Sequence, residues 1–174
     1  MDSYEISAKY NQWMNNSIYN TCVKMGQESI ESNQSAFFGS ILKTLNHLLV
    51  GDIIWLYRCS GDKSHLNLKD AGGNRVTISG LDQILYADLK ELFEIRQKID
   101  LCIISYINGL DRGNNDKLIV YKTSQGVDKT NTLADILMHW FNHQTHHRGQ
   151  VTAMISQQGY DYGSTDLIYI KDDF

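Results

Sequence analysis

Four of the six histidines in the chain lie within nine consecutive residues: His139, His143, His146 and His147. Residues four apart on an α-helix share one face, so His139, His143 and His147 would form a ladder along one side of a helix. Two histidines at positions i and i+4 can direct both imidazoles at one metal ion, as in zinc-binding helices. We therefore predict that His143 and His147 are metal ligands. His146, about 100° from His147 around the helix axis, is expected to flank them.

Two other interpretations of these histidines are available. In the first, they are structural or surface residues, which is the usual role of a single histidine in a helix and the one we assign to His65. Four histidines in nine residues of an amphipathic segment favour metal binding instead. The second is a zinc metalloprotease, which needs a glutamate directly after the first histidine of the pair. That position holds Gln144, which cannot act as a general base, so protease activity is excluded.

The elements that must position these histidines are long helices. Apolar residues recur at intervals of three and four along four segments. The predicted helices are residues 3–25, 36–58, 81–107 and 132–158. Thr132 and Asp135 form a capping-box-like start to the last of them, and Gly159 is a natural end. Gly51, inside the second helix, is expected to permit a close contact with a neighbouring helix.

The segments between the predicted helices are irregular or extended. Residues 59–80 are interrupted by several glycines. Residues 117–122 are a β-type run followed by a turn signal at residues 125–126, which predicts a small β-hairpin before the last helix. No repeat or linker divides the chain. We predict one domain over residues 1–174, all-α in class, with the architecture of a four-helix bundle.

The composition excludes several classes of protein. Hydrophobic residues make up 42% of the chain and charged residues 21%, which predicts a folded core rather than disorder. The net charge of -4 and the scattered basic residues argue against nucleic-acid binding. The three cysteines are odd in number and form no C-x-x-C, which fits a reducing compartment. With no signal-peptide pattern and no membrane-length apolar stretch, we expect a cytoplasmic protein without membrane contact.

The sequence resembles the DinB family of damage-inducible, metalloenzyme-like proteins. The matching stretches are residues 10–15 (YNQWMN), 37–56 (FFGSILKTLNHLLVGDIIWL), 141–150 (FNHQTHHRGQ), 157–161 (QQGYD) and 165–166 (TD). Together they span nearly the whole chain, and the NHQTHHRGQ string is specific. One departure from the family is the complete absence of proline, which concerns the connecting loops and not the site.

The resemblance implies a four-helix bundle that is commonly a homodimer. It also implies that one divalent transition metal is held by one histidine of the second helix and two of the last, which are His47, His143 and His147 here. Imidazole binds zinc, nickel, iron and copper, of which zinc and nickel are the first candidates. Some relatives transfer a thiol such as bacillithiol, mycothiol or glutathione, others isomerise maleylpyruvate with a thiol, and many have no established activity.

Three neutral imidazoles would leave the ion with an open coordination position. A water there is acidified to a pKa of about 7, and a thiol there is deprotonated to the nucleophilic thiolate. The hypothesis is that the metal activates a low-molecular-weight thiol, which attacks a small electrophilic substrate. Two alternatives share the same three histidines: a metal-dependent hydrolase, and a non-enzymatic, stress-related metal-binding dimer.

Further residues are assigned supporting roles. Asp52, five residues after His47, is the acidic candidate for orienting substrate or a ligand, and its alternative role is a salt bridge with Arg148. Asp135 is expected to support the site by orienting His139. Substrate contacts are expected from His139, together with two aromatic residues for which simple packing is the alternative. These aromatic residues are Tyr10 and Trp13.

Overall fold

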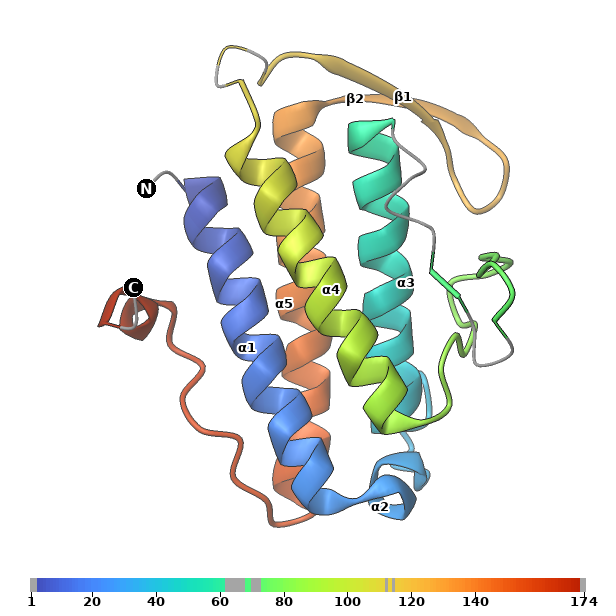
Figure 1. Cartoon of the computed structure of the whole chain (residues 1–174), viewed down its shortest axis with the longest axis vertical. Helices are drawn as coiled ribbons and strands as arrows, with labels where there is room; N and C mark the ends of the chain where they lie inside the picture. The colour runs from blue at the N-terminus through green and yellow to red at the C-terminus, as the bar shows by residue number, and fades with distance from the viewer. Residues whose placement is uncertain (1–2, 62–67, 70–72, 112, 114, 173–174) are drawn as a thin grey trace.

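The computed structural model describes residues 3–61, 68–69, 73–111, 113 and 115–172. Four long helices run side by side along the molecule (Figure 1). They are α1 (Ser3–Met25), α3 (Ile41–Ser60), α4 (Leu89–Asn108) and α5 (Leu133–Gln157). The predicted all-α class and helical bundle are confirmed. His65, to which a structural role was assigned, lies outside the described residues.

Each long helix packs against two others. α1 and α3 both contact α4 and α5, so each of the four helices occupies one corner of the bundle. A short helix, α2 (Gln27–Glu31), follows α1, and a 3-10 helix, η3 (Leu167–Asp172), ends the described chain and contacts α1. Because α3 and α5 are neighbours, residues of the second and last predicted helices can share one site.

Side-chain caps determine where the helices begin. Thr132 caps α5 by accepting a hydrogen bond from the Asp135 amide at 3.1 Å, as predicted. The third predicted helix begins at Leu89 rather than at residue 81, because the Asp88 side chain caps it. The residues before it are not helical, and the Asn46 side chain accepts hydrogen bonds from the amides of Leu85 and Tyr86 there. α3 likewise begins at Ile41, where the Ser40 hydroxyl caps it.

The predicted β-hairpin is also present. β1 (Leu118–Lys122) and β2 (Asp128–Thr132) are antiparallel, with Val120 opposite Thr130. The hairpin lies over the ends of α3 and α5 (Figure 1). Arg58 ties it to α3 by donating to the carbonyl oxygen of Lys122 at 2.6 Å. The hairpin therefore borders the same pair of helices that carries the histidines.

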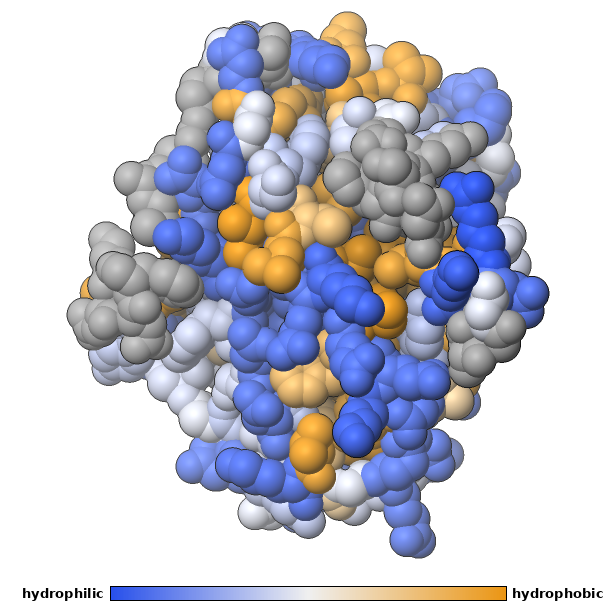
Figure 2. Space-filling view, viewed as in Figure 1, coloured by the Kyte–Doolittle hydropathy of each residue, from blue (hydrophilic) through white to orange (hydrophobic). Residues whose placement is uncertain are grey.

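Polar and apolar side chains separate between surface and core. On the face seen in Figure 2, hydrophilic side chains cover most of the exposed surface, and apolar groups emerge in small separate areas. The buried apolar residues form one core between the four long helices. None of the helices in the described part of the chain has both the length and the apolar character needed to cross a membrane.

Candidate metal centre

Three histidine rings meet between α3 and α5. His47 comes from α3, and His143 and His147 come from successive turns of α5. The Nε2 atom of His47 lies 3.1 Å from Nε2 of His143 and 3.3 Å from Nε2 of His147. One ligand atom from each ring lies within 4.8 Å of the others. The structure thus brings the three predicted ligands together, and this cluster could hold a metal ion.

Hydrogen bonds on the far side of two rings orient their lone pairs. His47 Nδ1 lies 2.7 Å from the Leu81 carbonyl oxygen, and His147 Nδ1 lies 2.8 Å from Gln150 Oε1. Because both oxygens only accept hydrogen bonds, each Nδ1 carries the proton and donates it. In the neutral rings, both Nε2 atoms then present lone pairs to each other at 3.3 Å. A cation between them would turn this repulsion into attraction, so the donor set fits a metal ion.

The cluster is kept in the neutral form that binds metals. Burial lowers the pKa of His143 to about 3, and the neighbouring rings of His147 and His47 act in the same direction. Burial also lowers the pKa of His47 and of His147. A metal ion does not have to displace protons from such rings at neutral pH. The charge environment therefore favours metal binding as the geometry does.

Two features that the sequence interpretation missed shape this centre. Phe38 stacks on His47, with ring centroids 4.2 Å apart, and meets the edge of His147 at 5.5 Å. Leu81 contributes only a main-chain oxygen, for which residue type gives no signal. Phe38 lies within one of the stretches that resemble the DinB family, so the motif was the available clue to it.

Gly51 is the close helix contact that was predicted, and it faces the centre. A Cβ atom at this position would lie 3.3 Å from Cε1 of His143. We predict that Gly51→Ala displaces the His143 ring and weakens metal affinity by roughly 10-fold or more, as changes beside metal ligands do. A competition titration with a chromogenic chelator measures this.

Gly149→Ala is the matched control, because a Cβ at that helical position meets nothing within 4 Å. It should leave metal affinity unchanged and stabilise α5 by about 0.5–1 kcal/mol through helix propensity. Equal metal affinities of Gly51→Ala and Gly149→Ala would contradict the role assigned to Gly51.

The lowered histidine pKa values predict an acid sensitivity of the metal-free protein. In the unfolded chain, His143 takes up a proton below its ordinary pKa of 6.5, whereas the folded protein resists protonation down to about 3. The unfolded state thus binds more protons between these values, and stability falls as the pH falls through this range. Between pH 7 and pH 5, wild type should lose about 1 kcal/mol more than His143→Gln, after allowance for partial exposure. Urea unfolding of chelator-treated protein measures both losses, and equal losses would refute this assignment.

His139 lies beside the centre. Its ring centroid is 6.0 Å from that of His143 and 5.2 Å from that of Trp55. It lines a cavity of about 540 Å³ together with His47 and His143. Asp135 instead caps α5, where its Oδ2 accepts from the Thr132 hydroxyl at 2.7 Å. No hydrogen bond joins Asp135 to His139 within the described residues, so the structure does not place Asp135 as the group that orients His139.

The two aromatic residues of α1 lie elsewhere. Tyr10 donates its hydroxyl to the Thr165 carbonyl at 2.6 Å and lies beside Trp13, with centroids 6.1 Å apart. Tyr10 lines a different cavity, of about 670 Å³, between α1, α5 and the C-terminal segment. The histidine cavity is lined by neither residue. Packing, the alternative considered for both, agrees with this placement.

Asp52 lies in the bundle core and does not line the histidine cavity. Its Oδ1 accepts from the Trp140 indole at 2.5 Å, and its Oδ2 pairs with Arg96 at 2.6 Å. The ion pair anticipated for Asp52 therefore exists with Arg96, on α4, instead of Arg148. Arg148 is buried as well and donates to Asn11 and to Thr145. In these positions, Asp52 and Arg148 link helices in the core.

Comparisons with known proteins find relatives of this chain. A protein-family model described as "DinB family" matches residues 1–172. "Protein DinB" of Bacillus subtilis (strain 168) is 28% identical over 158 residues, which cover 91% of this chain and 87% of the relative. No solved structure matches the chain. The matched region contains all three histidines of the centre.

Proposed function

The chain belongs to the DinB family, and on that premise we propose that its three histidines hold one divalent transition metal ion, with zinc and nickel as the first candidates. The observation that carries the proposal is the convergence of three Nε2 atoms from His47, His143 and His147. Two of these rings already donate their other nitrogen to oxygen acceptors, which is the usual support for a metal-binding histidine.

We further propose that the centre activates a low-molecular-weight thiol for attack on a small electrophile. When bound, the ion would supply a coordination position at which the pKa of a ligand falls. The cavity beside His143 and His139, about 540 Å³, has the size of small-molecule sites. Trp55 and Ile54 give it apolar walls, which would hold the organic part of a substrate.

The residues around the cavity favour a thiol over water as the nucleophile. No carboxylate is found among the described residues that line it, so a general base of the metalloprotease kind is missing there. A thiol with a pKa of about 8.5 needs only a small shift to ionise at neutral pH. Metal-bound water also ionises near neutral pH. The missing general base is therefore what supports S-transfer ahead of hydrolysis.

The test begins with protein purified without a nickel column. Mass spectrometry should find about one transition metal ion per chain, which three imidazole ligands can hold. A panel of thiols with a chromogenic aryl halide should then give turnover that chelation removes, and ester and amide substrates should give none. Absence of metal, with no uptake of added zinc or nickel, would overturn the metal proposal. Turnover of esters without a thiol would point to a hydrolase, and metal without turnover to a metal-binding protein that is not an enzyme.

The homodimer implied by the family is part of the same proposal. Light scattering coupled to size-exclusion chromatography measures it directly. A mass of twice 19.9 kDa is the expected result, and a mass of 19.9 kDa would rule it out under those conditions.

A further inference from the structure

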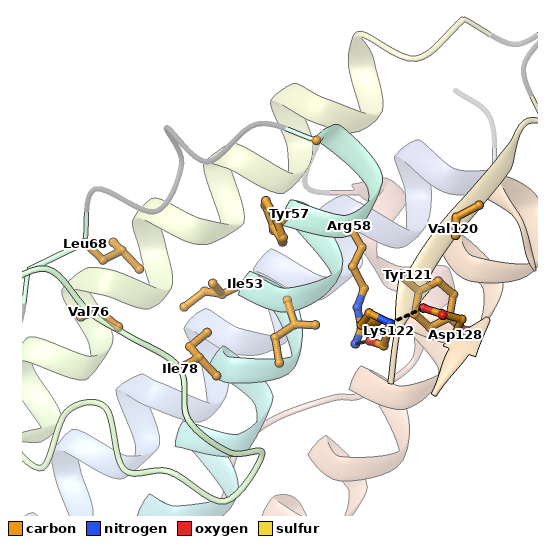
Figure 3. Close-up of a pocket in the computed structure, with 12 residues that line it drawn as sticks. Ile53, Tyr57, Arg58, Leu68, Val76, Ile78, Val120, Tyr121, Lys122 and Asp128 are labelled. Carbon is orange, nitrogen blue, oxygen red and sulfur yellow. Dashed lines mark hydrogen bonds and ion pairs between the residues drawn. The ribbon is translucent and has the colours of Figure 1, made fainter. Parts of the chain in front are cut away.

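A second cavity adjoins the one beside the histidines. It has a volume of about 710 Å³ and lies between α3, the hairpin and the segment before α4 (Figure 3). Ile54, Arg58, Ile78 and Tyr121 line both cavities. The two cavities therefore adjoin along α3, and together we call them the α3 groove. It runs from His47 and His143 at one end to Arg58 and beyond at the other.

Arg58 is a cation held in this groove by contacts with two aromatic rings and a carbonyl oxygen. Its guanidinium carbon lies 4.6 Å from the ring centroid of Trp55 and 4.6 Å from that of Tyr121. One terminal nitrogen donates to the Lys122 carbonyl at 2.6 Å. Two aromatic faces and a hydrogen bond thus position a group that has five N–H donors. Within the described part of the chain, its one hydrogen bond is the one to Lys122, which leaves donors for another acceptor.

The positive charge of Arg58 limits what the groove could bind. Among the described residues, no Asp or Glu forms an ion pair with it. Lys122 and Asp128, at the rim, pair with each other at 2.7 Å, so they add no net charge. Partial burial lowers the pKa of Arg58, which reflects the cost of removing a cation from water. An anion in the groove would offset that cost and could form a charge-assisted, bidentate contact.

The remaining walls of the groove are apolar. Figure 3 shows Ile53, Ile78 and Tyr57 gathered on one side, while Arg58 extends toward Tyr121 and the Lys122–Asp128 pair. Leu68 and Val76 extend the apolar side. A ligand that contacts both Arg58 and the apolar walls needs an anionic end and an apolar body. A flat carboxylate matches the guanidinium fork better than a point anion would.

The length of the groove limits the ligand further. His47 and Arg58 are eleven residues apart on α3, which corresponds to about 16 Å along the helix axis. Part of this distance is spanned by the two side chains. A molecule that touches both ends is therefore elongated.

We propose that Arg58 anchors the carboxylate of an elongated, largely apolar ligand in the α3 groove, with the other end of the ligand at the histidine cluster. The placement of the other end at the histidines rests on the proposed function, because the ligand would be the thiol or its electrophilic partner. The anchoring of a carboxylate at Arg58 stands on the groove alone.

The test uses 4-phenylbutanoate and the neutral 4-phenylbutanamide as probes. Calorimetry should show that the metal-loaded wild-type protein binds the carboxylate at least about 10-fold more tightly than the amide, as expected of a charge-assisted bidentate contact. Arg58→Gln should remove the preference, and Arg58→Lys should keep only part of it. Lys43→Gln is the matched control, because it removes an exposed cation from the same helix that lines neither cavity, and it should keep all of the preference. Equal affinities of the two probes for wild type would overturn the proposal, and so would an unchanged preference in folded Arg58→Gln.

Two further arms separate this inference from the metal proposal. His143→Ala should keep the carboxylate preference, because Arg58 does not depend on the metal centre; its loss in a folded His143→Ala protein would refute that independence. In turnover assays, a thiol that carries a carboxylate and an electrophile that carries one are each compared with the analogue in which the carboxylate is a neutral amide. The partner whose carboxylate is held by Arg58 should show a KM at least about 10-fold higher in Arg58→Gln, with kcat nearly unchanged. No KM change for either partner would overturn the placement of the ligand's other end at the histidines, even if Arg58 still binds the carboxylate.

Discussion

His143→Ala is expected to lose its metal. Wild type should carry about one ion per chain, whereas the variant should bind with an affinity lower by more than roughly 100-fold, since even partners outside the ligand shell are worth 10- to 100-fold. The reason is geometric, because His143 Nε2 lies 3.1 Å from that of His47 and completes the triangle of donors. His47→Ala should show the same loss, although it lies on another helix. Metal analysis after dialysis against a weak chelator measures both.

His146→Ala is the matched control for this experiment. Its ring lies next to His147, with centroids 4.8 Å apart, and it stands on the same helix. Its ligand atoms do not belong to the cluster of three. This variant should keep the full metal content. Full metal in His143→Ala, or equal losses in His143→Ala and His146→Ala, would show that the ion is held elsewhere.

The second large effect is expected from the buried charges of the bundle core. Arg96 lies between two carboxylates, at 2.6 Å from Asp52 and 2.9 Å from Asp100, and all three side chains are almost completely buried. Asn15 donates to Asp100 at 3.0 Å, so the chain of contacts reaches α1. These polar residues connect α1, α3 and α4 through a layer that the apolar core surrounds.

Arg96→Met should destabilise the protein by about 3–5 kcal/mol, because it leaves two buried carboxylates without their cation. Urea unfolding measures the difference. Lys122→Met is the control, since it removes the exposed ion pair with Asp128, whose side chains are 67% and 72% accessible. Exposed pairs contribute less than about 1 kcal/mol. A loss of similar size in both variants would mean that the buried network contributes little.

The pH dependence of the Arg96→Met effect gives a second readout. Burial raises the pKa of Asp100 to about 6, and the charge of Arg96 acts against this rise. Without Arg96 the folded-state pKa of Asp100 would rise further, so the folded variant would hold a proton that the unfolded chain releases. Stability of the variant then falls as the pH rises. The destabilisation by Arg96→Met should therefore be larger at pH 8 than at pH 5, and an effect independent of pH would contradict the charge explanation.

Local features of this protein could be predicted from its sequence. Apolar periodicity located the four long helices, although two of them begin later than predicted. The hairpin, the Thr132 cap and the pairing of His143 with His147 on one face were predicted correctly. Each of these depends on residues a few positions apart. An α-helix has 3.6 residues per turn, so the spacing of two residues along it fixes their relative directions without help from the rest of the chain.

The contacts between helices were decided by the tertiary structure. The resemblance to a family was needed to connect His47 with the two histidines of α5, and residue spacing alone could not do so. The Leu81 carbonyl, Phe38 above the rings, and Arg96 as the partner of Asp52 follow from how the helices are rotated and packed against each other. That packing depends on side chains spread over the whole chain, acting together. Spacing within one helix therefore determined two of the three histidines of the candidate metal centre, and the association of α3 with α5 added the third.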